Sequence, residues 1–206
     1  MQRLSTPLSV ALLALLCVWQ AALPLAFFLR LAELPRPALG GLARGAVPLY
    51  TAAGALLWIA AHEMAHAAAA RCCGVRGGGV EWSPPLPAFY APPQPALDRS
   101  DTRFLICIAG PMLDLLLSLA LAAAAVLAPT GSATVLRSLF VISLLAGMPN
   151  CCVLAGSDMD QGMHAFGQLC GSRWPSRLYG VLSACYAATV ILMVVQLVLH
   201  SRPGIV

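Results

Sequence analysis

Charged residues are scarce in this 206-residue chain, and lysine is absent. Charged side chains make up 10% of the residues, against about 25% in soluble domains, while 60% are hydrophobic and the mean hydropathy is +0.83. The formal net charge of +4 is spread along the chain, with no basic block dense enough to bind nucleic acid. The composition therefore argues against a nucleic-acid-binding protein and predicts an integral membrane protein that contacts the lipid bilayer.

The chain also lacks any CxxC pair. Five of its eight cysteines fall in or beside apolar stretches, where cysteine behaves as a small hydrophobe. Cys72 and Cys73 are neighbours, but no CxxC pair accompanies them. We therefore predict neither a disulfide scaffold nor a cysteine zinc site.

Five apolar segments are long enough to be membrane spans, because about 20 helical residues cross a bilayer. They cover residues 8–29, 46–70, 104–128, 133–155 and 178–199. A cleaved signal peptide is the alternative for the first segment, but its apolar run exceeds the usual length of about 7–15 residues. The chain is predicted to be an all-α membrane protein with about five transmembrane helices.

A segment rich in proline and glycine, residues 71–103, separates the second and third spans. Three consecutive glycines and six prolines prevent a long helix there. We predict a short strand or hairpin around Val80 to Trp82, and the segment is too short to hold an inserted domain. It is either a plain connector or a loop that contacts substrate.

The sequence His62-Glu63-Met64-Ala65-His66 lies near the end of the second apolar segment. On a helix both imidazoles can face one zinc ion, and Glu63 lies beside them, where it can accept a proton from water that the zinc activates. Such short patterns also arise by chance. Here, however, residues 45–61 carry no charge, and an ionisable group in an apolar span costs at least about 2.5 kcal/mol unless it has a partner or a task. A metallohydrolase site is therefore predicted.

Carboxylates follow in the next two spans. Asp114 lies at a depth similar to that of His62, where it is either a partner of the site or a protonated structural residue. The fourth span is expected to break near Pro149 and leads to Asp158, which lies at the depth of His66 because spans two and four run in the same direction. This predicts a site of two histidines and one carboxylate for one zinc ion per chain, with water in the fourth position.

These residues resemble the site-2 protease family of intramembrane zinc metalloproteases. Three features match in order: HExxH in a membrane helix, Gly110-Pro111 at the head of the next span, and Asn150 followed eight residues later by Asp158. The resemblance covers about residues 46–162. We therefore divide the chain into an N-terminal transmembrane helix with its connection (1–45), a protease core of three spans (46–170) and a C-terminal transmembrane helix (171–206).

The resemblance implies an intramembrane zinc endopeptidase that cleaves a transmembrane segment of a membrane-protein substrate. In this interpretation zinc is bound by His62, His66 and Asp158, and Glu63 activates the attacking water. Members of the family cut a substrate that another protease has already trimmed, and so release a soluble domain.

The chain also departs from the family pattern. Val153 stands where the family usually has proline, Met159 where it has glycine directly after the aspartate, and Asp114 where it often has asparagine. Asp160 is therefore a second candidate ligand, and Asp114 and Asn150 are candidates either for hydrogen-bonding a ligand or for replacing one.

Two other functions compete with proteolysis. A non-catalytic relative could keep the fold as a membrane binding or chaperone protein, but such a protein has no need of Glu63. A metal-permeation protein needs ionisable groups at several depths, whereas here they cluster at one level.

The arginines predict an orientation. Seven lie on the face that bears the N-terminus and residues 71–103, and five lie on the other, so the positive-inside rule places the first face in the cytoplasm. A cysteine introduced beside Pro92 should therefore react with a membrane-impermeant thiol reagent only after the cells are permeabilised. Modification on intact cells would reverse the orientation.

Overall fold

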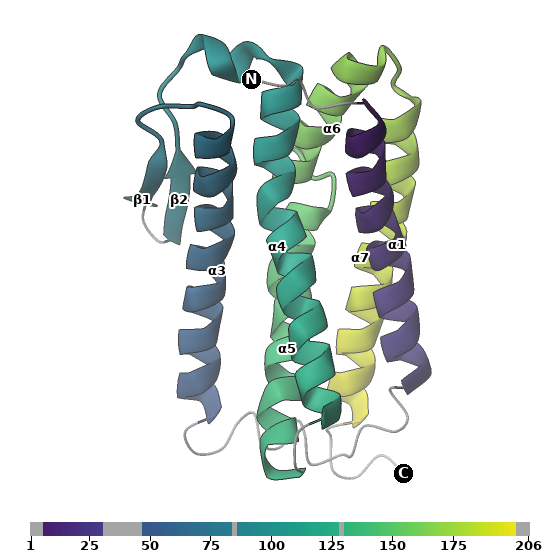
Figure 1. Cartoon of the computed structure of the whole chain (residues 1–206). Helices are drawn as coiled ribbons and strands as arrows, with labels where there is room; N and C mark the ends of the chain where they lie inside the picture. The colour runs from purple at the N-terminus through teal and green to yellow at the C-terminus, as the bar shows by residue number, and fades with distance from the viewer. Residues whose placement is uncertain (1–5, 31–46, 84–85, 128–129, 201–206) are drawn as a thin grey trace.

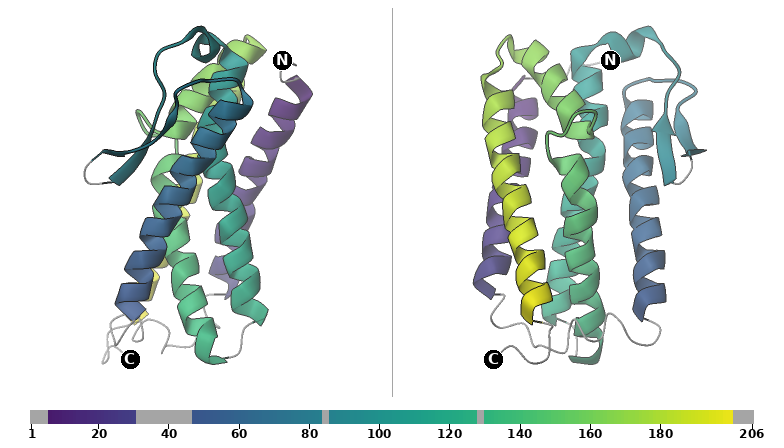
Figure 2. Two further views of the ribbon diagram at one scale, coloured as in Figure 1. Left: turned by 60° about the vertical axis from the view of Figure 1, so that its left-hand side comes forward. Right: turned by 180° about the vertical axis from the view of Figure 1, so that it is seen from behind.

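The computed structural model describes residues 6–30, 47–83, 86–127 and 130–200. These form a helical bundle with one β-hairpin beside it (Figures 1 and 2). The elements are α1 (Thr6–Arg30), α3 (Val47–Cys72), β1 (Gly79–Ser83), β2 (Leu86–Tyr90), the 3-10 helix η2 (Pro95–Asp98), α4 (Ser100–Leu127), α5 (Thr130–Cys151), α6 (Asp158–Cys170) and α7 (Trp174–His200). The prediction of a mostly helical chain is confirmed, and residues 31–46 lie outside the described part.

Helices lie at all five segments that were predicted to be membrane spans, namely α1, α3, α4, α5 and α7. Within the described residues, one stretch is both long and apolar enough to cross a membrane: Ser100–Leu121 of α4, with a mean hydropathy of 2.2. The five helices are thus shown, whereas five crossings are not. The fourth helix begins at Thr130 and ends at Cys151, four residues before the predicted end of the span, and the break predicted near Pro149 is wrong because the helix continues through it.

Helix α4 lies at the centre of the bundle (Figure 1). It packs against α3 on one side and against α5 and α6 on others, while α1 pairs with α7. Both strands of the hairpin pack against α3. The helix that carries the HExxH sequence is therefore enclosed between α4 and the hairpin.

A glycine ends α3 and turns the chain back toward it. Gly74 has a φ of +80°, its N–H donates to the Arg71 carbonyl at 3.0 Å, and the Val75 N–H donates to the Ala70 carbonyl at 2.9 Å. This pair of bonds is the Schellman arrangement, and the buried Val75 packs with Ala70 and Ile106. The chain then forms the antiparallel strands β1 and β2, which confirms the predicted hairpin.

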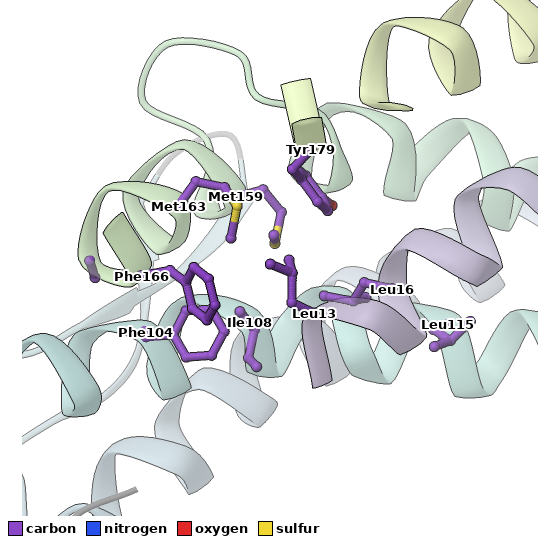
Figure 3. Close-up of a cluster of buried hydrophobic side chains, with 10 residues drawn as sticks. Leu13, Leu16, Phe104, Ile108, Leu115, Met159, Met163, Phe166 and Tyr179 are labelled. Atoms are coloured by element: carbon purple, nitrogen blue, oxygen red, sulfur yellow. The ribbon is translucent and has the colours of Figure 1, made fainter. Parts of the chain in front are cut away.

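A buried apolar cluster joins α6 to the rest of the bundle (Figure 3). Phe104 of α4 and Phe166 of α6 lie with their ring centroids 5.1 Å apart. Around them lie Leu13, Leu16, Ile108, Leu115, Met159, Met163, Ala165 and Tyr179, from α1, α4, α6 and α7. This packing fixes the start of α6, where Asp158 lies.

Candidate metal centre

Three side chains from α3 and α6 converge on one point. The Nε2 atoms of His62 and His66 are 3.1 Å apart, and Asp158 Oδ2 lies 2.9 Å from the first and 3.1 Å from the second. Within the described part of the chain, these three residues form the group that could hold a metal ion. Both histidines are buried, whereas the Asp158 side chain is 26% exposed. Asp158 is therefore the most exposed member of the group.

Hydrogen bonds at the far ring nitrogens orient both histidines. His66 Nδ1 donates to the Ile106 carbonyl at 2.6 Å, and His62 Nδ1 donates to Asp114 Oδ2 at 2.8 Å. A carbonyl oxygen can only accept, so the proton of the neutral His66 ring is on Nδ1 and Nε2 presents a lone pair. Partners of this kind are common for metal-binding histidines, because they fix the ring and its tautomer.

The three ligand atoms are close enough together to contact one small cation. Around zinc, with ligand distances near 2.1 Å, tetrahedral ligand atoms lie about 3.4 Å apart. The observed separations of 2.9–3.1 Å are somewhat shorter than that value. Two imidazole nitrogens and one carboxylate oxygen also form a donor set that zinc uses in catalytic sites, where a fourth position stays open. The group can therefore hold a metal ion, and its donor types are compatible with zinc.

Helix α4 leaves room for the two imidazoles by means of Gly110. A Cβ atom at this position would lie 2.5 Å from both His66 Nε2 and His62 Cε1, closer than real Cβ contacts allow. Ile106 and Asp114 lie one helical turn to either side, on the same face of α4. One face of α4 thus supplies a carbonyl, a gap and a carboxylate to the histidines of α3.

The start of α6 places Asp158 and Asp160 differently. Ser157 caps the helix, and its Oγ accepts from the Asp160 N–H at 3.2 Å. Asp160 Oδ2 in turn accepts from the Gly156 N–H at 3.1 Å, an exchange similar to a capping box. Asp160 is therefore engaged in the helix cap, while Asp158 reaches the histidines.

The other candidate residues lie around the same group. Asn150 Nδ2 is 3.3 Å from His62 Nε2. Glu63 does not contact the histidine nitrogens, and its Oε2 accepts from the Phe89 N–H of β2 at 2.6 Å. The sequence analysis did not anticipate the contributions of the Phe89 amide and the Ile106 carbonyl, because backbone groups leave no residue signature.

The cysteines take no part in this centre. All eight are free thiols, as the sequence analysis predicted. Burial raises the pKa of the Cys73 thiol, and its neighbours Cys72 and Asp101 raise it further, so the metal-binding thiolate is disfavoured there.

Compared with family models, curated proteins and solved structures, the chain matches none of them. The chemistry of the site is therefore the basis for assigning a function.

The Gly110 gap gives a first test of the centre. We expect Gly110→Ala to push the two Nε2 atoms away from each other and to weaken Zn²⁺ binding by about 10-fold or more, as loss of ligand support does. Gly180→Ala in α7 is the matched control, since a Cβ there meets no atom within 4 Å. Elemental analysis and Zn²⁺ titration of both purified variants measure the effect. Equal Zn²⁺ affinity in the two variants would contradict the geometry.

The two carboxylates of α6 give a second test. Asp158→Asn should lose Zn²⁺, because an amide replaces the charged ligand oxygen. Asp160→Asn should retain Zn²⁺, because its amide oxygen can still accept from the Gly156 N–H. Zn²⁺ content after purification without chelators distinguishes them. Loss of Zn²⁺ from the Asp160 variant alone would make Asp160 the third ligand. Retention of Zn²⁺ in both variants would make Asp114 the next candidate.

Proposed function

We propose that this chain is an intramembrane zinc-dependent endopeptidase of the site-2 protease type, which cleaves a transmembrane segment of a membrane-protein substrate. The observation that carries the proposal is the convergence of His62, His66 and Asp158 on one point, with Glu63 directly beside the first histidine. A carboxylate next to a metal-binding pair on one helix is the arrangement that metalloproteases use.

The three ligands would hold one zinc ion per chain. Zinc bound there would polarise a peptide carbonyl and lower the pKa of a water molecule toward neutrality. Asp114 and the Ile106 carbonyl keep the two imidazoles turned toward the metal. The partial exposure of Asp158 supports access of water to the group.

Glu63 is the general base in this proposal. The Phe89 N–H holds one carboxylate oxygen, and the second is left for a proton. Glu63 would accept the proton of the attacking water and return it to the amide nitrogen as the peptide C–N bond breaks. Its position on α3 supports this role, since residue i+1 lies beside the face that carries both imidazoles.

We further propose that α1, α3, α4, α5 and α7 cross the membrane, which makes the protein multi-pass. The shortest of them has 22 residues and the longest 28, against about 20 needed for a bilayer. Large apolar side chains are exposed on their surfaces, among them Val18, Leu57, Leu127 and Val181. Lipid would cover such side chains, and a peptide bond that reaches His62 would then come from a membrane-embedded segment.

Glu63→Gln tests the reaction. The amide keeps the shape of the side chain but removes the proton acceptor, so we expect one zinc ion per chain, as in the wild type, and no cleavage. Elemental analysis measures the zinc. Mass spectrometry of cells expressing either form identifies membrane-protein fragments whose new ends lie inside a transmembrane segment.

The results separate the competing functions. Fragments that appear with the wild type and disappear with Glu63→Gln support proteolysis. Zinc in both forms with identical fragment patterns would favour the membrane binding or chaperone protein. Wild-type protein that binds no zinc would defeat the metal assignment itself.

A further inference from the structure

Two side chains from outside the metal centre hold the backbone next to it. At the end of α5, the Cys151 carbonyl accepts from Gln20 Nε2 of α1 at 2.7 Å and from the Tyr179 hydroxyl of α7 at 2.8 Å. Gln20 Nε2 also donates to the Tyr179 oxygen at 2.8 Å. Both side chains are buried, Gln20 at 3% and Tyr179 at 1% exposure. The three groups form a closed triangle among three helices.

The Cys151 carbonyl needs these donors because a helix ends there. The last carbonyls of a helix have no partner within it, and the next turn here does not supply one. The Leu154 N–H and the Ser157 hydroxyl both donate to the Cys152 carbonyl, at 2.8 Å and 2.7 Å. The Cys152 carbonyl is thus satisfied locally, whereas that of Cys151 depends on α1 and α7.

Gln20 is held in this place for its donor group. Its other polar atom, Oε1, is buried and has no hydrogen-bond partner. A buried polar atom without a partner is unfavourable, and an apolar side chain of the same size would avoid that cost. The amide is therefore better explained by the two bonds that its NH₂ group donates than by packing.

The position of Cys151 connects the triangle to the centre. Asn150, the residue before it, places its side-chain nitrogen 3.3 Å from His62 Nε2, and the segment after it leads to the Ser157 cap and Asp158. We propose that Gln20 and Tyr179 are positioning residues: they fix the end of α5 so that Asn150 and Asp158 reach the two histidines. The inference rests on the proposed function only in requiring that the centre binds a metal.

The test uses Gln20→Leu and Tyr179→Phe in the full chain. Each removes donors while keeping most of the side-chain volume, and the phenylalanine keeps the ring of Tyr179 in its apolar cluster. Ser118→Ala is the matched control, because it removes a buried hydroxyl that bonds Ser143 across α4 and α5. Zn²⁺ affinity is measured in detergent by competition with a chromogenic chelator, and the visible spectrum of the Co²⁺ form reports ligand geometry.

We expect both variants to bind Zn²⁺ about 10–100-fold more weakly than the wild type and to show an altered Co²⁺ spectrum. Ser118→Ala should match the wild type in both. Thermal unfolding of the metal-free proteins checks that each variant is folded. If Gln20→Leu does not fold, Tyr179→Phe alone tests the proposal. Wild-type affinity and spectrum in the folded variants would overturn the proposal.

If the wild type binds Zn²⁺ and Gln20→Leu and Tyr179→Phe bind it equally tightly, the inference is wrong and the proposed function stands. If the wild type binds none, both fall.

Discussion

Two imidazole nitrogens and one carboxylate oxygen repel one another at 2.9–3.1 Å unless a shared proton or a cation lies between them. Burial strengthens this repulsion, because little water is present to screen it. The surrounding structure acts against it from several directions. Hydrogen bonds at each Nδ1 hold the rings, the apolar cluster around Phe104 and Phe166 holds α6, and a serine cap fixes its first turn. These elements bring three side chains together where a shared proton or a bound ion makes their proximity favourable.

Helix α4 contributes to this arrangement without supplying a proposed ligand. Ile106, Gly110 and Asp114 follow at intervals of four, so all three face α3. They provide, in order, an acceptor for His66, space for both rings and an acceptor for His62. Substitutions at Gly110 or Asp114 therefore act on the histidines directly, although neither residue is among the three proposed ligands.

Much of the helical architecture could be predicted from the sequence. Apolar runs separated by glycine and proline indicated five of the helices, and the HExxH spacing fixed which face of α3 carries chemistry. Asp158 was preferred to Asp160 by spacing and depth, whereas a physical signal lay in Ser157, whose position three residues before Asp160 is typical of a helix cap. The same cap explains why α6 begins at Asp158 rather than further along.

Other parts could not be predicted from residue types. The donor to Glu63 and the acceptor for His66 are backbone groups, which every residue carries, so only the fold reveals them. Gln20 was visible as a lone amide in an apolar run, but its partner is 131 positions away, a distance that local patterns do not bridge. The membrane crossings of α1, α3, α4, α5 and α7 are predictions from composition and helix length.

The turn at Gly74 links two lengths of chain that look independent. It sends the hairpin back along the helix that it ends, so the Phe89 N–H meets Glu63 on the same helix. Each helical residue turns the chain by about 100°, so the number of residues between Glu63 and Gly74 sets the direction in which the hairpin departs. The length of that stretch therefore determines which side of α3 the hairpin covers. One residue more or fewer would place the hairpin on another side of α3. Among related chains, the hairpin could therefore vary freely in sequence while this interval stays constant in length.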